Sequence, residues 1–430
     1  MSCYSDSITP DSFSGIVFAL EGVSRSIVLI NGPSGCKYYH SAVSDNQTLR
    51  QYEFDPFNYS EKWYFGQPRV PCTYLDSDDY IYGSTDKLTE ALEFLRDNAP
   101  FDLLCIVNSP GAALIGDDLR GIAGRIIKEK SVVIIETPDF SRDICTGYET
   151  AAAALLDSLP LNSAARSQPN TVNILGLSIF HKYFAGDILE LRRLLELCGV
   201  TVNCFLCADC DIDTIRRIPE AALNIVIHPE YGMKTARCLK ERYGTPFYLC
   251  DGPPIGFSAT EKFIGGICTA LGCDSSLFRR ESERARARAY AYISQVNSLT
   301  GLPKGVHFAV EGTYSELYAY TSFLVRYFGM IPEALSVLNE GSDCCKERLQ
   351  ALLNGLALPQ ALDRDLTETD SELVFASGNT IAKLKLRRHM FSGIEISLPS
   401  LGYIDVIPKT HIGLQGALML TEQVLNGLAF

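Results

Sequence analysis

Short apolar runs alternate with amphipathic segments in the first third of the chain. Three runs rich in valine, isoleucine and leucine are typical of buried strands: 26–30, 103–107 and 131–136. Three segments with apolar residues at helical spacing predict helices: 84–98, 119–128 and 149–159. Because strands that alternate with helices form parallel sheets covered on both faces, this part of the chain predicts an α/β domain.

The alternation continues in two further series, which begin at residues 171 and 307. The second series ends with a long helix of mixed charge, predicted over 275–299. Within that series, Ser258 and Glu261 have the spacing of a capping box, which predicts that a helix begins there. The sequence therefore predicts three consecutive α/β domains with parallel sheets: 1–168, 169–300 and 301–430.

Composition indicates large cores and argues against two classes of partner. Of the 430 residues, 47% are hydrophobic, which is enough for several domains with their own cores. The net charge of −13 argues against unspecific nucleic-acid binding, because neutralising phosphates needs a basic surface. No apolar run approaches the roughly 18–20 residues that span a bilayer, and the N-terminus lacks the pattern of a secretory signal. We therefore expect a cytoplasmic protein with no nucleic-acid or membrane partner.

Three loops shaped by glycine or proline follow predicted strands, and two of them carry a cysteine. Cys36 ends the loop 31–36, Cys72 follows a proline, and the third loop is 108–111. Such loops form sites in α/β proteins, and thiolates on them suit iron–sulfur clusters. Cys36 and Cys72 are therefore candidate metal ligands. Two cysteines cannot complete a four-ligand cluster, so the remaining ligands must come from elsewhere in the chain or from another subunit.

The other cysteines of the chain point mostly to packing. The count of 15 is odd, which argues against a disulfide framework in a long cytosolic chain. Cys204, Cys207 and Cys210 form a C-x-x-C-x-x-C run that looks like the start of a bacterial ferredoxin motif, but its fourth element is missing. Packing is therefore favoured over a second cluster or a zinc site, although Cys207 and Cys210 could line a cavity.

Three histidines are further candidates. His228 follows a predicted strand and could donate a proton or bind a ligand near neutral pH. The alternative is an ordinary hydrogen-bonded loop histidine, and position alone favours it. His411 is a similar case, and His40 could support a ligand at Cys36.

Two nucleotide-binding motifs are missing from the sequence. It contains no G-x-x-x-x-G-K-[ST] loop and no convincing G-x-G-x-x-G turn. We therefore do not expect the chain to bind ATP or NAD by those routes. If it is a reductase, its electrons must arrive through a metal cluster from a partner.

The three loops resemble segments of the nitrogenase component 1 family, which also includes the dark-operative protochlorophyllide reductases. The resemblance rests on three segments of the first domain: 32–36, 72–83 and 114–118. It continues through three segments of the later domains: 217–224, 252–256 and 309–312. It implies three Rossmann-like domains around a central cavity and a dimeric core. It also implies an iron–sulfur cluster at the subunit interface and an ATP-hydrolysing iron protein as electron donor.

The resemblance assigns roles to individual residues. Cys36 and Cys72 match the first two cluster cysteines, but the usual third position is occupied by Pro110. The missing thiolate favours a single [4Fe–4S] cluster over an eight-iron cluster. Two copies of the chain, each giving Cys36 and Cys72, would supply four ligands in a homodimer; a heterodimer with a related component 1 subunit is the competing arrangement. Where nitrogenase has a cofactor cysteine, this chain has His228.

Together these features predict a subunit of a nitrogenase-like iron–sulfur oxidoreductase. It would receive low-potential electrons from the iron protein and reduce a substrate in the central cavity. Cys207, His228 and His411 are expected to line that cavity, where a second metallocofactor could bind, and His228 is the candidate catalytic residue. Two alternatives remain open: a non-catalytic scaffold for metallocofactor assembly and transfer, and a simple α/β binding protein whose cysteines belong to the core.

Overall fold

The structure is a computed structural model, and it describes six stretches of the chain: 10–36, 70–136, 142–162, 167–338, 343–387 and 390–428. His40 lies outside the described residues. The chain divides into two compact units. The N-terminal unit comprises Ile8–Asn162 and Leu206–Ile218, and the C-terminal unit is built mainly from Ser163–Phe205 and Pro219–Phe430. The domain limits expected from the sequence stay predictions.

The N-terminal unit contains a three-stranded parallel sheet. Its strands, in spatial order, are β1 (Ser26–Asn31), β2 (Leu103–Asn108) and β3 (Ser131–Ile135). All three lie where the apolar runs predicted them. Every residue of β1 and β2 is buried, as expected for parallel strands covered on both faces.

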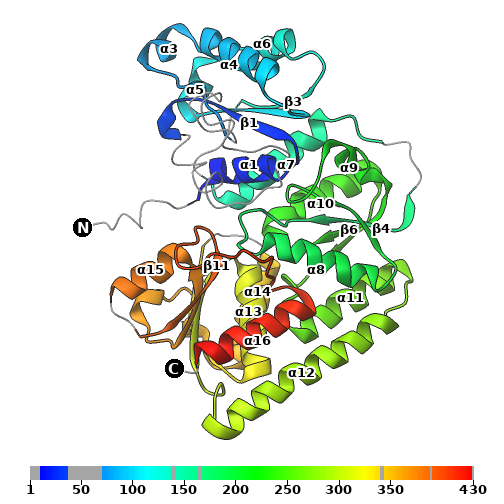
Figure 1. Cartoon of the computed structure of the whole chain (residues 1–430), viewed down its shortest axis with the longest axis vertical. Helices are drawn as coiled ribbons and strands as arrows, with labels where there is room; N and C mark the ends of the chain where they lie inside the picture. Colours follow the sequence, from blue (N-terminus) through cyan, green and yellow to red (C-terminus); the bar gives the residue numbers. More distant parts are fainter. Residues whose placement is uncertain are drawn as a thin grey trace. The chain divides into compact units, whose positions relative to one another are not determined.

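Helices cover both faces of this sheet (Figure 1). On one face, α4 (Thr85–Asn98) and α6 (Leu119–Ile126) pack in a single apolar core with Leu104 and Ile106 of β2. The opposite face is covered by α1 (Ser12–Glu21) and α7 (Ile144–Ser158). Because side chains alternate along a strand, Cys105 faces away from the core that holds Leu104 and Ile106.

The helices α1 and α7 cross closely at two glycines. A Cβ added at Gly15 would lie 2.0 Å from the carbonyl oxygen of Ile144, and one added at Gly147 would lie 1.7 Å from that of Ser12. Only glycine fits at these two positions, because the facing backbone occupies the space of a side chain. The sequence analysis placed no helix at 12–21.

The C-terminal unit contains two four-stranded sheets, and all strand pairs in them are parallel. The first sheet has the order β5 (Thr201–Phe205), β4 (Gln168–Leu175), β6 (Ala221–Val226), β7 (Phe247–Leu249). The second has the order β11 (Ser392–Ser397), β10 (Leu373–Ser377), β8 (His307–Gly312), β9 (Ile331–Val337). The predicted α/β class with parallel sheets is therefore confirmed.

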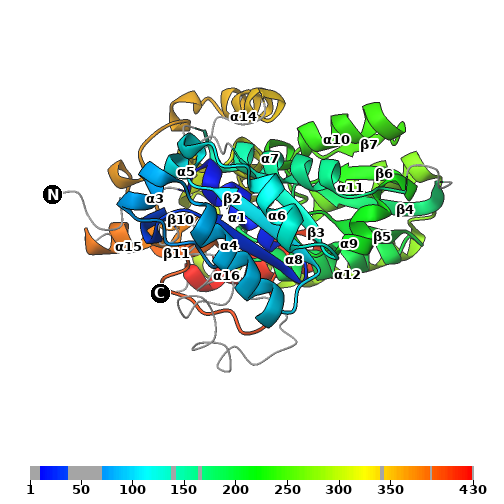
Figure 2. The same cartoon turned by 90° about the horizontal axis from the view of Figure 1, so that it is seen from above.

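Helices connect and cover these strands. They are α8 (Phe184–Glu196), α10 (Pro229–Tyr243), α11 (Phe257–Leu271), α12 (Ser276–Thr300), α13 (Tyr314–Phe328), α14 (Asp343–Gly355), α15 (Gly378–Leu386) and α16 (Gly413–Gly427). The long charged helix predicted over 275–299 corresponds to α12, which α16 contacts (Figure 1). Figure 2 shows α15 beside β10 and β11, which it contacts.

The capping box expected at Ser258 is wrong. The helix α11 begins at Phe257, and its N-cap is Gly256, whose φ of 85° favours glycine. Ser258 therefore lies within the first turn, and Glu261 faces α12, where it accepts hydrogen bonds from Ser282 (2.7 Å) and Arg286 (2.9 Å). A glycine that starts the helix earlier replaces the side-chain cap.

None of the helices in the described stretches is long and apolar enough to cross a membrane.

Candidate functional site

The three predicted loops of the N-terminal unit meet at the side chain of Asn31. Its Nδ2 donates hydrogen bonds to Asn108 Oδ1 (2.9 Å) and Ser84 Oγ (3.1 Å). Its Oδ1 accepts one from the Thr73 hydroxyl (2.9 Å), which in turn accepts one from the amide of Gly32 (3.0 Å). Asn31 and Thr73 are buried, so these bonds fix the loops after β1 and β2 against the segment that carries Cys72.

Cys72 is held by its backbone beside β1. The amide of Ile30 donates to Pro71 O (2.9 Å), and the amide of Thr73 donates to Ile30 O (3.0 Å), so Cys72 continues the sheet as an isolated parallel bridge. Its side chain is fully buried. Burial, together with the neighbouring Cys72 sulfur, raises the pKa of Tyr74 to about 12. The sulfur therefore lies in a rigid, dry position.

Cys36 is half-buried and lies beside the third loop. Burial raises the pKa of its thiol, while a hydrogen bond from the Ser109 hydroxyl opposes that shift. Gly32 makes this approach possible, because a Cβ at Gly32 would lie 2.5 Å from Ser109 Cβ. Tyr80 also lies here, since a Cβ at Gly111 would meet its ring at 2.7 Å.

Pro110, at the position expected for a third cysteine, begins a helix instead. The helix α5 (Pro110–Ile115) has Ser109 as its N-cap, and the Ser109 hydroxyl accepts a hydrogen bond from the Ala112 amide (3.3 Å). Proline suits this first helical position because no amide hydrogen bond is needed there. Cys105 is fully buried in the middle of β2. Among the described residues of these loops, the thiols are those of Cys36 and Cys72.

Cys207 lies in the same N-terminal unit and is fully buried. A Cβ at Gly22 would lie 1.9 Å from its carbonyl oxygen, and the Tyr148 hydroxyl donates to Leu206 O (2.8 Å). Burial, and then the nearby Cys210 and Cys105, raise the pKa of the Cys207 thiol. This is the environment of an inert core cysteine, and a cavity-lining role for Cys207 stays a prediction. Cys204, by contrast, is buried in β5 of the C-terminal unit.

His228 lies in the C-terminal unit, where it precedes α10 as the N-cap residue without a side-chain capping bond. Its ring stacks on that of His181, with centroids 4.2 Å apart and an interplanar angle of 18°. Burial, and then the proximity of His181, lower the pKa of His228 well below its ordinary value. Its Nδ1 is buried and has no hydrogen-bond partner. Both histidines are therefore neutral at neutral pH.

Glu316 faces this histidine pair from α13. One carboxylate oxygen, Oε2, accepts hydrogen bonds from the amide (2.9 Å) and hydroxyl (3.0 Å) of Thr313, which complete a capping box at the start of the helix. The other, Oε1, lies 4.0 Å from His181 Nε2. Burial raises the pKa of Glu316 to about 7, and burial lowers that of His181 to about 4.

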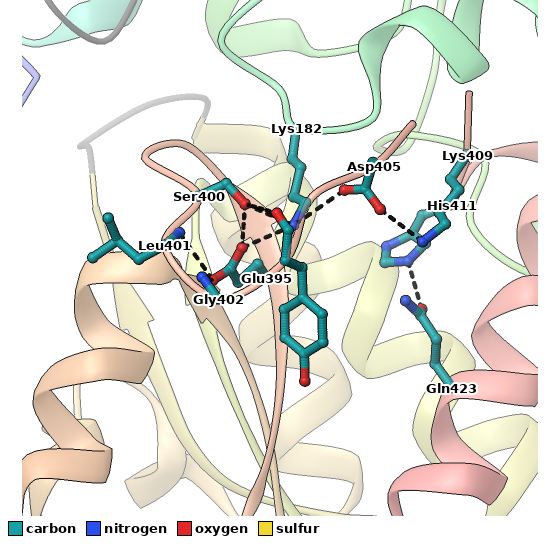
Figure 3. Close-up of polar contacts among 10 residues, drawn as sticks. Lys182, Glu395, Ser400, Leu401, Gly402, Asp405, Lys409, His411 and Gln423 are labelled. Carbon is teal, nitrogen blue, oxygen red and sulfur yellow. Dashed lines mark hydrogen bonds and ion pairs between the residues drawn. The ribbon is translucent and has the colours of Figure 1, made fainter. Parts of the chain in front are cut away.

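His411 belongs to a different polar cluster of the C-terminal unit, shown in Figure 3. Its Nδ1 is hydrogen-bonded to the Tyr320 hydroxyl (2.8 Å), and its Nε2 to Gln423 Oε1 (2.7 Å). Burial lowers the pKa of His411 to about 3. Both ring nitrogens are thus engaged, so a ligand at His411 would have to displace one of these partners. Its cavity-lining role stays a prediction.

The segment that precedes His411 is anchored by a buried ion pair. Lys182 Nζ lies 2.8 Å from Glu395 and 3.2 Å from Asp405, and Glu395 also accepts the amide of Gly402 at 2.7 Å (Figure 3). These bonds hold the loop after β11, and so they fix the backbone that leads to His411.

A family model described as "Nitrogenase component 1 type Oxidoreductase" matches residues 12–429. The chain belongs to this family. The expected family and oxidoreductase class are thereby confirmed.

Relatives and solved structures agree with this assignment. One of the two kinds of subunit of the light-independent protochlorophyllide reductase of Heliobacterium modesticaldum is 23% identical over 420 residues, which cover 96% of this chain and 76% of that protein. The corresponding protein of Gloeobacter violaceus is 24% identical over 417 residues, 93% of this chain and 78% of that protein. A structure titled "Nitrogenase Cp1 at pH 6.5" superposes with a TM-score of 0.77 and 17% identity over 98% of this chain and 92% of the other, which shows a common fold.

Two residues of this component 1 type oxidoreductase escaped the sequence analysis. Glu316 had a usable signal, because Thr313 and Glu316 have the spacing of a capping box. His181 had none, since it precedes α8 in a stretch without a motif. The sequence did indicate His228, and the structure adds its two neighbours.

Proposed function

We propose that the chain is the subunit of a nitrogenase-like reductase that holds half of the ligands of a [4Fe–4S] cluster. The observation that carries this proposal is the buried hydrogen-bond network of Asn31, which fixes the Cys36 and Cys72 loops against each other. Two thiols on rigid strand-end loops fit two of the four ligands that such a cluster needs. The other two would come from a second copy of the chain or from a related component 1 subunit.

The residues around the two thiols prepare them for metal. Burial keeps Cys36 protonated in the free protein, so binding iron would release a proton from this thiol. Asn31 and Gly32 fix the distance between the loops, and the Ser109 hydroxyl can stabilise the Cys36 thiolate by donating a hydrogen bond. When bound, the cluster would supply one-electron transfer at low potential.

We infer that these electrons come from a separate ATP-hydrolysing iron protein. The sequence contains neither of the two nucleotide loops that would let the chain use ATP or NAD itself. Protochlorophyllide is the substrate to test first, because the relatives that match more than nine-tenths of this chain are named for its reduction. His228, with its lowered pKa and partnerless Nδ1, is the best-placed of the three predicted cavity residues to contact a substrate.

Anaerobic cycling of the cluster tests this function. The purified chain is mixed with a nitrogenase-type iron protein, ATP and dithionite, and the oxidation state of its iron is followed by electron paramagnetic resonance. We expect ATP-dependent reduction, and reoxidation when protochlorophyllide is added as electron acceptor. A cluster that never changes oxidation state would contradict the proposal. Release of bound metal to an apo-protein without turnover would support the alternative of an assembly scaffold.

A further inference from the structure

His181, His228 and Glu316 bring three ligand atoms to one point inside the C-terminal unit. One nitrogen from each histidine and one oxygen from the glutamate all lie within 4.8 Å of one another. His181 is 7% exposed and His228 is 4% exposed, yet His181 Nε2 and His228 Nδ1 have no hydrogen-bond partner. A buried polar atom without a partner costs about 1–3 kcal/mol, so the cluster is built for something that binds there.

The hydrogen-bond pattern of His181 decides which nitrogen carries its proton. The backbone amide of Ser178 donates to His181 Nδ1 (3.1 Å), so Nδ1 is the unprotonated nitrogen. In the neutral ring Nε2 must then carry the hydrogen, and Nε2 is the atom that points at Glu316. His181 therefore offers a donor, which has no acceptor.

Glu316 offers a second donor at the same point. Its Oε2 already accepts two hydrogen bonds from Thr313, which leaves Oε1 toward the histidines. Four groups face this carboxyl: His181 and His228, which are neutral, and Glu230 and Tyr320. Glu230 raises the pKa of Glu316 further than burial alone, and Tyr320 stays protonated because burial raises its pKa. Glu316 is therefore largely protonated below pH 7.

The spacing suits a bound oxygen atom better than a metal ion. An oxygen placed centrally among three atoms 4.8 Å apart lies about 2.8 Å from each, which is the length of a hydrogen bond. A zinc ion would need nitrogen and oxygen ligands at about 2.0–2.2 Å. Metal-bound histidines also donate their other ring N–H, whereas Nδ1 of His181 accepts a hydrogen bond.

We propose that His181, His228 and Glu316 bind one hydrogen-bond-accepting oxygen of the substrate, from a carboxylate or a carbonyl group. This inference rests on the proposed function for the word "substrate" only, because the site is complete within this chain. His181 Nε2–H and the protonated Glu316 donate to the oxygen, and the stacked ring of His228 closes the third side. Ionisation of Glu316 removes one donor and places a negative charge beside the oxygen, so binding weakens as the pH rises.

Acetate and acetamide are the probes for the two kinds of oxygen. The full-length protein is labelled with ¹⁵N-histidine, the His181 signal is assigned from His181→Gln, and each probe is titrated at pH 6 and pH 8. We expect a saturable shift of His181 Nε2 at pH 6 and an affinity for acetate about tenfold lower at pH 8, because a carboxyl with a pKa of about 7 is mostly ionised there. A site for carbonyl groups predicts that acetamide binds and acetate does not.

Glu316→Gln is the sharpest variant. Glutamine can keep the capping bond to Thr313, so the helix should remain intact, and its amide is a donor at every pH. We expect this variant to bind the probe with an affinity that no longer changes between pH 6 and pH 8. His307→Gln, at an exposed histidine on β8, is the control and should behave as wild type.

Two results would overturn the inference. One is the lack of a saturable shift with either probe, in wild type and in His228→Gln. The other is a shift with Zn²⁺ that strengthens from pH 6 to pH 8, which would mark a metal site with the opposite pH dependence. Iron content, measured on the same samples, separates this inference from the proposed function, since Cys36→Ser/Cys72→Ser should lose iron and still bind the probe.

Discussion

Gly32 sets how closely the Cys36 loop approaches the loop after β2. An added Cβ would lie 2.5 Å from Ser109 Cβ and 2.6 Å from its Oγ, whereas an added Cβ at Gly35 meets nothing within 4 Å. Ser109 cannot move away easily, because its amide donates to Asn31 O (2.8 Å) and its hydroxyl caps α5. The same short loop thus holds one glycine that the packing requires and one that it does not.

The pair Gly32→Ala and Gly35→Ala tests this difference. We expect Gly32→Ala to lower the free energy of unfolding by about 1–3 kcal/mol, the usual cost of overpacking, and to reduce the iron bound per chain. Gly35→Ala should resemble wild type in both measurements, which are urea unfolding and iron analysis. Equal behaviour of the two variants would show that the contact between Gly32 and Ser109 does not hold the site.

The sequence revealed the cysteine site more fully than the histidine site, for a physical reason. Cys36 and Cys72 follow strand-end turns, and parallel strands bring their carboxyl ends to one edge, so proximity could be expected. Glu316 and His181 lie on α13 and before α8, and nothing local to either residue encodes their meeting. Their contact depends on how two sheets of the C-terminal unit pack.

At the scale of elements, the crossing of α1 and α7 carries the strictest packing requirement. Gly15 and Gly147 leave no room for a side chain at the crossing. All ten residues of α1 are buried, so the helix shows no amphipathic stripe, and the sequence analysis missed it for that reason. The strands, in contrast, were found because strands buried on both faces appear as continuous apolar runs.

Gly147→Ala and Gly124→Ala make a matched pair of helical glycine substitutions. We expect Gly147→Ala to destabilise the protein strongly, because the added Cβ would lie 1.7 Å from Ser12 O. Gly124 lies in α6 with nothing within 4 Å, so Gly124→Ala should be neutral or stabilise by up to about 1 kcal/mol. Thermal unfolding measures both, and a stable Gly147→Ala would contradict the close crossing.

At the scale of the whole molecule, the chain order and the compact units differ. Residues Leu206–Ile218 return to the N-terminal unit after β5 has been built into the C-terminal unit. Gly22 allows this return, because the carbonyl of Cys207 occupies the place of its side chain. A sequence read in linear order cannot show such a return, although the strand–helix alternation did predict three parallel sheets.

The central claim is that Cys36 and Cys72 hold iron together with another subunit. The most direct measurement is the iron and sulfide content of the anaerobically purified protein, with its mass in solution, for wild type and Cys36→Ser/Cys72→Ser. Cys238→Ser, at a half-buried cysteine of α10, is the control. The account predicts about four irons and four sulfides per dimer, lost in the double variant and kept in the control. Iron that survives in the double variant would contradict it.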